Sequence, residues 1–138
     1  MNANLIFWPV LAQILLTIAM YALLGARKRR AIEAGGVDRQ QTALDNRAWP
    51  ADVVKVSNNI ANQFEGPVLF YVLAFVLYAI DGVDVIALTL AWIYVASRYV
   101  HAYIHVGSNY VPARFSAFLF GMLMLMGLLM VAAVRLAL

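Results

Sequence analysis

The chain has 138 residues, of which 64% are hydrophobic and 12% are charged, and it contains no cysteine. An ordinary soluble domain has about 45–50% apolar and about 25% charged residues, so this composition excludes an ordinary water-soluble domain. Because cysteine is absent, the chain has no disulfide, no thiolate metal site and no thiol nucleophile of its own, and any sulfur chemistry must use a thiol brought by a substrate.

Four apolar segments account for most of the chain. They cover residues 5–26, 54–80, 85–106 and 113–136. About 20 helical residues cross the hydrocarbon core of a bilayer, so each segment predicts a membrane-spanning helix. We therefore expect a single domain over residues 1–138 with an all-α integral-membrane fold, a bundle of four transmembrane helices.

The segment 5–26 predicts a retained membrane anchor, not a cleaved signal peptide. No basic region precedes it, and its apolar stretch exceeds the roughly 7–15 residues of a signal-peptide core. A run of four basic residues beginning at Arg27 follows it, where a signal peptide would have small residues for cleavage.

The connection 27–53 predicts the orientation of the chain. Seven of the ten basic residues lie between Arg27 and Lys55, whereas the turn between the second and third segments carries only Asp81 and Asp84. Lys and Arg are enriched in cytoplasmic loops, so we expect a multi-pass protein of a bacterial inner membrane with both termini on the non-cytoplasmic side. The basic run abuts a span and lacks stacking aromatics, which favours contact with anionic lipid headgroups over nucleic acid binding.

Polar side chains gather on one face near the start of the segment 54–80. Asn58, Asn62 and Glu65 are spaced i, i+4, i+7, and two further amides flank them. Pro67 cannot donate a backbone hydrogen bond, which predicts a kink at this point. The amides are either interhelical fasteners or ligand contacts. A carboxylate at membrane depth such as Glu65 indicates a functional site.

The segment 85–106 carries a second polar face. Arg98, His101 and His105 are spaced i, i+3, i+7 and therefore share one side of the helix. The second segment runs away from the long loop and the third runs back, so this face is expected to meet the first and to pair Arg98 with Glu65. Such a pair is either a structural salt bridge or part of a ligand site, and both readings stay open.

The two histidines alone do not predict a metal site. His101 and His105 at i, i+4 can place two imidazoles on one ion. However, the glutamate of a zincin helix is missing between them, and no third ligand is evident beyond Glu65. We therefore expect no bound metal.

Taken together, these residues resemble a known family. The basic run after the first segment, the motif Asn62-x-x-Glu65-x-Pro67 and the pair Arg98-x-x-His101 are similar to those of short bacterial-type MAPEG proteins, the membrane-associated proteins in eicosanoid and glutathione metabolism. The resemblance covers essentially the whole chain. It implies a left-handed four-helix bundle, a homotrimer, and a site between subunits that opens toward the cytoplasmic half of the bilayer.

The resemblance also implies a glutathione site. Asn62 and Glu65 match positions that bind the amino end and glycyl part of glutathione. Arg98 matches the arginine of the third helix, and His101 a position often filled by a ligand-binding tyrosine; His105 likewise replaces a phenol.

Two arginines complete the implied site. Arg27 matches a basic residue that meets a ligand carboxylate, and Arg114 is the nearest candidate for the catalytic arginine that stabilises the thiolate. One departure concerns Asn58, which stands where members that use glutathione usually have arginine.

Three functions are compared on this basis. The leading hypothesis is a glutathione transferase-like or peroxidase-like enzyme, or a binder, that places glutathione or a related thiol as co-substrate against a lipophilic small molecule from the membrane lipids. The alternative is a non-catalytic accessory or structural subunit of a larger membrane complex. A transporter or channel is disfavoured, because the four spans show no inverted repeat and no continuous polar path.

Overall fold

The computed structural model describes all 138 residues, and the chain is helical throughout apart from short connections. Four of its helical stretches are long and apolar enough to cross a membrane, which confirms the predicted all-α class with four membrane-length helices. In chain order the elements are η1 (Ala3–Ile6), α1 (Phe7–Ala34), α2 (Arg39–Leu44), η2 (Asn46–Ala48), α3 (Ala51–Gln63), α4 (Gly66–Ala79), α5 (Val85–Val106) and α6 (Val111–Ala137).

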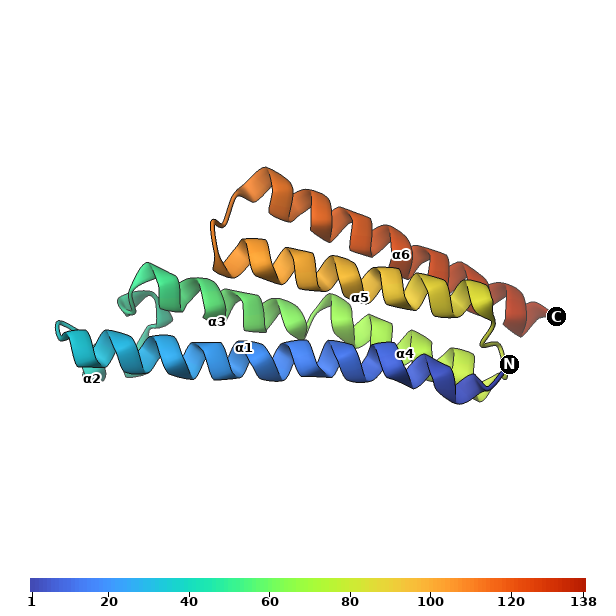
Figure 1. Cartoon of the computed structure of the whole chain (residues 1–138), viewed down its shortest axis with the longest axis horizontal. Helices are drawn as coiled ribbons and strands as arrows, with labels where there is room; N and C mark the ends of the chain where they lie inside the picture. Colours follow the sequence, from blue (N-terminus) through green and yellow to red (C-terminus); the bar gives the residue numbers. More distant parts are fainter.

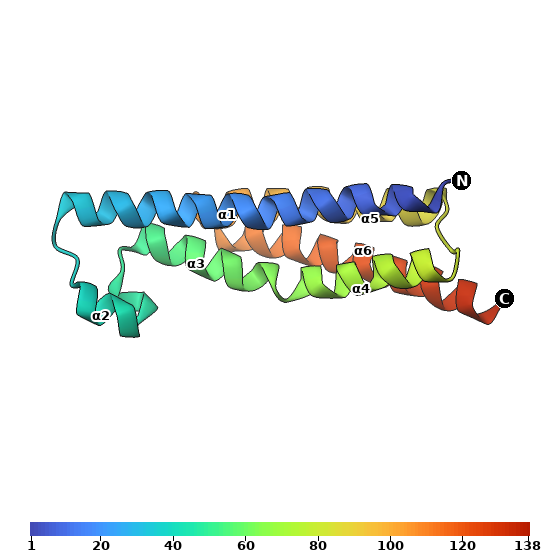
Figure 2. The ribbon, with the colours of Figure 1, turned by 90° about the horizontal axis from the view of Figure 1, so that it is seen from below.

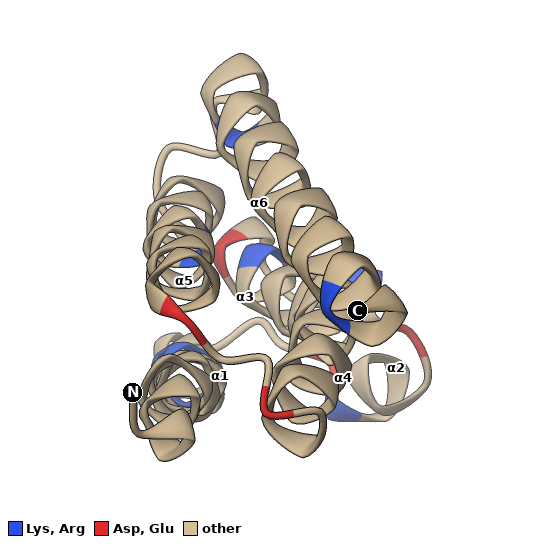
Figure 3. Cartoon of the chain, turned by 90° about the vertical axis from the view of Figure 1, so that its right-hand side faces the viewer, with Lys and Arg blue, Asp and Glu red and all other residues tan.

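The long helices form an elongated bundle. α1, the α3–α4 pair and α5 lie side by side along the long axis, and α6 crosses them obliquely (Figures 1 and 2). Both termini lie at one end of the bundle, and α2 lies at the other. Viewed from the end that carries the termini, the helices show few charged residues (Figure 3). We call the opposite end, with α2 and η2, the loop end.

The helix expected over 54–80 is interrupted. α3 ends at Gln63, and α4 begins at Gly66 with Pro67 in its first turn. Pro67 lacks the N–H that would continue the helix, so the turn closes through other bonds, among them Phe64 N to Ala61 O at 3.0 Å. The predicted kink is confirmed, and it takes the form of a break that leaves Glu65 between two helices.

The long connection is shorter than expected, because α1 continues through the basic run to Ala34. Its added residues are mostly good helix formers, and an Arg29–Glu33 pair at 2.8 Å supports this exposed turn. Gly35 and Gly36 then end the helix with φ of 80° and 81°, values that residues with a side chain rarely adopt.

The bundle interior differs between its two ends. The apolar core, which includes Ile6, Phe70 and Leu128, lies in the half near the termini. Phe70 packs on Tyr94 with ring centroids 4.8 Å apart. Toward the loop end buried apolar residues such as Val53 and Val56 are joined by the buried polar side chains of the bundle: Gln13, Asn59, Gln63, Ser97, Arg98, His101 and His105. The candidate site lies in this polar half.

Candidate functional site

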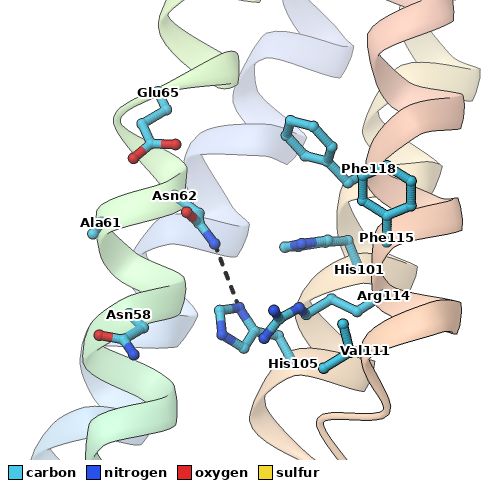
Figure 4. Close-up of a pocket in the computed structure, with 10 residues that line it drawn as sticks. All are labelled: Asn58, Ala61, Asn62, Glu65, His101, His105, Val111, Arg114, Phe115 and Phe118. Carbon is cyan, nitrogen blue, oxygen red and sulfur yellow. Dashed lines mark hydrogen bonds between the residues drawn. The ribbon is translucent and has the colours of Figure 1, made fainter.

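A cavity of about 530 Å³ opens between α3, α5 and α6 (Figure 4). α3 and the break after it supply one wall, α6 supplies the other, and two histidines of α5 lie between them. Six of the eight predicted site residues line it: Asn58, Asn62, Glu65, His101, His105 and Arg114. Apolar residues complete the lining: Ala61, Val111, Phe115 and Phe118. The structure thus brings most of the predicted site together.

The predicted ion pair between Glu65 and Arg98 is wrong for this structure. Glu65 is exposed and makes no salt bridge or side-chain hydrogen bond, whereas Arg98 is only 2% exposed and does not line the cavity. Glu65 lies in the break between α3 and α4 and lines the cavity with Asn58 and Asn62, whereas the Arg98 side chain is buried on α5 outside that lining, so the two side chains do not pair.

Arg27, predicted to bind a ligand carboxylate, also lies outside the cavity lining. Its Nη1 donates to the backbone oxygen of Asp52 at 2.7 Å, and its Nη2 donates to the backbone oxygen of Val106 at 2.9 Å. The last carbonyls of a helix have no partner within that helix, and Val106 is the last residue of α5. The guanidinium therefore holds α1 to α3 and α5, which is a structural role.

A chain of buried amides runs across three helices to the cavity. Gln13 of α1 donates from Nε2 to Gln63 Oε1 at 2.8 Å, and Gln63 Nε2 donates to Asn59 Oδ1 at 3.0 Å. Asn59 Nδ2 then lies 3.3 Å from Nδ1 of His105, and Asn62 Nδ2 lies 3.5 Å from the same atom. We call Gln13, Gln63, Asn59 and His105 the amide relay.

The amide orientations in the relay favour one tautomer of His105. The Nδ2 groups of Asn59 and Asn62 approach Nδ1, which fits an accepting Nδ1 and a ring proton on Nε2. This polarity leaves Oε1 of Gln13 without a partner at the far end. The reverse polarity would leave an amide NH₂ there, and unpartnered buried N–H groups are rarer than unpartnered carbonyls.

The polar pattern of the sequence indicates Asn59 and Gln63 only as amides that flank the predicted site, and it does not indicate a role for Gln13. The available signal was that Gln13 is the one side-chain amide in an otherwise apolar first segment. Polar side chains inside a membrane helix usually face the bundle interior and find a partner there.

Another row of polar atoms on α5 has no partner in the protein. Tyr94 Oη, Arg98 Nε and Nη2, and His101 Nδ1 are buried and make no hydrogen bond. These residues are spaced i, i+4, i+7 along one side of α5. Since buried polar groups are normally hydrogen-bonded, this row is suited to bound water or to polar groups of a ligand.

Arg114 is the cation of the cavity. It extends from the first turn of α6 toward His105 (Figure 4), and its Nη1 donates to Oδ1 of Asn109. Its partner is a neutral amide, so its charge stays available to an anion. The chain brings no group of three or more His, Asp or Glu side chains together at metal-binding distance.

Comparison with known proteins gives one match. The family model described as the MAPEG family matches residues 5–134, a range that includes every residue lining the cavity. No curated protein and no solved structure matches the chain. With its four membrane-length helices, the chain is an integral, multi-pass membrane protein. This match over nearly the whole sequence shows that the chain belongs to the MAPEG family.

Proposed function

We propose that this protein binds glutathione or a related low-molecular-weight thiol in the cavity and presents it to a lipophilic electrophile or hydroperoxide from the membrane. The observation that carries the proposal is that polar and apolar side chains line the same cavity. Glu65, His105 and Arg114 offer a carboxylate, an N–H donor and a cation, while Phe115 and Phe118 offer an apolar surface. A polar thiol ligand and an apolar partner can therefore meet in one place.

Each polar group has a role in this proposal. Arg114 stabilises the thiolate, which is the reactive form of the ligand. His105 donates its Nε2 proton to an acceptor on the ligand, since the amide relay keeps Nδ1 unprotonated. Glu65 accepts from the ligand ammonium group, because it is free of protein partners and lines the cavity.

The reaction needs no further cofactor. In a transferase step the thiolate sulfur forms a bond to the electrophilic carbon, and the thiol proton passes to the leaving group or to the carbanion that forms. In a peroxidase reaction two thiols are oxidised to a disulfide, while the hydroperoxide is reduced to an alcohol and water.

We propose that the working form is a homotrimer in which a neighbouring subunit covers the cavity. Asn58 and Glu65 are exposed although both lie within the span Ala51–Ala79. Polar groups at membrane depth are costly when they face lipid, so a protein surface is the favourable neighbour. The excess of basic residues at the loop end supports a cytoplasmic position for that end and a non-cytoplasmic position for both termini, as in a bacterial inner membrane.

Calorimetry on the purified protein tests thiol binding. We expect glutathione to bind, and we expect Arg114→Ala to lower the conjugation rate with a lipophilic aryl halide by about 100–1,000-fold, as for loss of one group that stabilises the reacting anion. Arg30→Ala is the matched control, because Arg30 is exposed on α1 and makes no ion pair. The proposal fails if no low-molecular-weight thiol binds and Arg114→Ala changes no rate.

A second candidate function is that of a non-catalytic accessory subunit in a larger membrane complex. The amide relay favours it, because its hydrogen bonds join α1, α3 and α5 and would serve the bundle without any ligand. Native co-purification decides between the two. A chain recovered only as an assembly of identical subunits would count against the accessory role.

A further inference from the structure

A second cavity of about 400 Å³ lies at the loop end, next to the first. It is formed by η2 and the start of α3 on one side and by the α5–α6 connection on the other. Arg114 lines both cavities, whereas Arg47, Trp49 and Lys55 line only the second. These last three residues give the second cavity a chemistry of its own.

The second cavity is cationic. Arg47, Lys55 and Arg114 line it, and no carboxylate does. Lys55 Nζ donates to the backbone oxygen of Gly107 at 3.0 Å, and Arg114 donates to the side chain of Asn109, so both cations have neutral partners.

Only Arg47 is neutralised nearby. It bonds Asp45 at 3.1 and 3.2 Å. This pair holds the pKa of Asp45 below its ordinary value, chiefly through the side-chain hydrogen bond from Arg47. Two uncompensated positive charges therefore remain around one cavity, and an anion with several acceptor oxygens would bridge them favourably.

The position of the cavity suggests the source of that anion. α3 begins at Ala51, α5 ends at Val106 and α6 begins at Val111, so the cavity lies where three spans end. In a membrane this is the level of the phospholipid headgroups. Trp49 lines the cavity, and tryptophan is enriched at that level.

We propose that the second cavity binds the phosphate group of an anionic phospholipid. Lys55 and Arg114 contact the phosphate, and Trp49, which lines only this cavity, lies beside the glycerol and acyl region of the lipid. Free phosphate has the same charge but brings no acyl chains. The inference goes beyond the thiol-binding proposal; it shares Arg114 with that proposal but requires no thiol ligand.

The test is lipid binding to the full chain in a neutral detergent, followed by native mass spectrometry. Phosphatidylglycerol and phosphatidylcholine are the lipid probes, and inorganic phosphate is the headgroup-only probe. Lys55→Gln removes the charge and keeps an N–H donor for Gly107, and Lys55→Arg keeps the charge. Arg30→Gln removes one exposed charge at the loop end outside the cavity and is the matched control.

We expect phosphatidylglycerol to bind more tightly than phosphatidylcholine. We expect Lys55→Gln to lower the affinity for phosphatidylglycerol by about 10-fold, which is the scale of one lost hydrogen bond to a charged group. The affinities of Lys55→Arg and Arg30→Gln should stay within about twofold of that of the unmodified chain. These results together support a built headgroup site.

Three results would overturn the proposal. Equal losses for Lys55→Gln and Arg30→Gln would indicate general surface attraction. Binding of inorganic phosphate with no preference for phosphatidylglycerol would identify a free anion as the ligand. A Lys55→Gln chain that keeps its phosphatidylglycerol affinity but loses glutathione affinity would assign Lys55 to the thiol site.

Discussion

Replacing Gln63 by leucine tests whether the amide relay stabilises the bundle and orients His105. Gln63 is 1% exposed and makes two side-chain hydrogen bonds, one to Gln13 at 2.8 Å and one to Asn59 at 3.0 Å. Leucine has a similar volume, so the change removes hydrogen bonds with little loss of packing.

The magnitude follows from the two lost bonds. Side-chain hydrogen bonds between membrane helices average about 0.6 kcal/mol and reach about 1.7 kcal/mol, so two of them amount to about 1.2–3.4 kcal/mol. We expect Gln63→Leu to lower the free energy of unfolding by about 1–3 kcal/mol. The upper half of this range applies because Nε2 of Gln13 and Oδ1 of Asn59 would be left buried without partners.

The assay is reversible unfolding in mixed micelles, followed by helical circular dichroism. Gln41→Leu is the matched control, because Gln41 is an exposed amide of α2 whose side chain makes no hydrogen bond. A second readout is the ¹⁵N spectrum of the His105 ring, which distinguishes a protonated from an unprotonated Nδ1. We expect an unprotonated Nδ1 in the unmodified chain and a mixture of tautomers in Gln63→Leu.

Two outcomes would refute this reasoning. If Gln63→Leu and Gln41→Leu have equal effects on stability, the relay contributes nothing beyond the burial of its members. If Nδ1 of His105 carries the proton in the unmodified chain, the relay has the opposite polarity and presents an acceptor to the cavity.

Three further predictions concern charged residues. Glu65→Gln should change the free energy of unfolding by less than about 0.5 kcal/mol, because Glu65 has no protein partner, yet it should weaken glutathione binding in calorimetry. Arg27→Ala should lower that free energy by about 1–3 kcal/mol through the loss of two hydrogen bonds to the backbone carbonyls of Asp52 and Val106, and should leave thiol affinity within about twofold. The pKa of Asp84 is lowered first by the backbone N–H of Ala87 and then by Arg135, so its stabilising contribution is complete above the unfolded value of about 3.9 and is lost as pH falls through the lower folded value. Unfolding curves at decreasing pH should therefore show a smaller acid loss for Asp84→Asn than for the unmodified chain.

The cavity lining was largely predictable because helical periodicity is a local property. Asn58 and Asn62 lie on one face of α3, and His101 and His105 lie on one face of α5, as their spacing requires. Two antiparallel neighbours then bring these faces together near the same end. The trimer, the thiol ligand and the membrane side of the termini stay predictions.

The Glu65–Arg98 pair, which is wrong, and the contacts of Arg27, whose ligand role stays a prediction, both depend on how distant segments pack, which helical periodicity does not determine. Glu65 faces the cavity with Asn58 and Asn62, but Arg98 is buried outside the cavity lining, so no pair between them forms. The Arg27 guanidinium donates to the backbone oxygen of Val106 at the end of α5. How far a helix end lies from a distant arginine is set by the packing of the helices. The contribution of Gln13 to the amide relay was not predictable for the same reason, because its hydrogen-bond partner Gln63 lies fifty positions away in the sequence.

The sequence by itself determined that the chain lies in a membrane, how many times it spans the membrane, which family it belongs to and where the second span breaks. Apolar length, local motifs and a proline act over short stretches of chain, so these properties can be read without the tertiary structure. Only the tertiary structure decided which polar groups meet. Hydrogen bonds and charge contacts depend on separations of a few ångströms, and those separations are set by how α1, α3, α5 and α6 pack against one another.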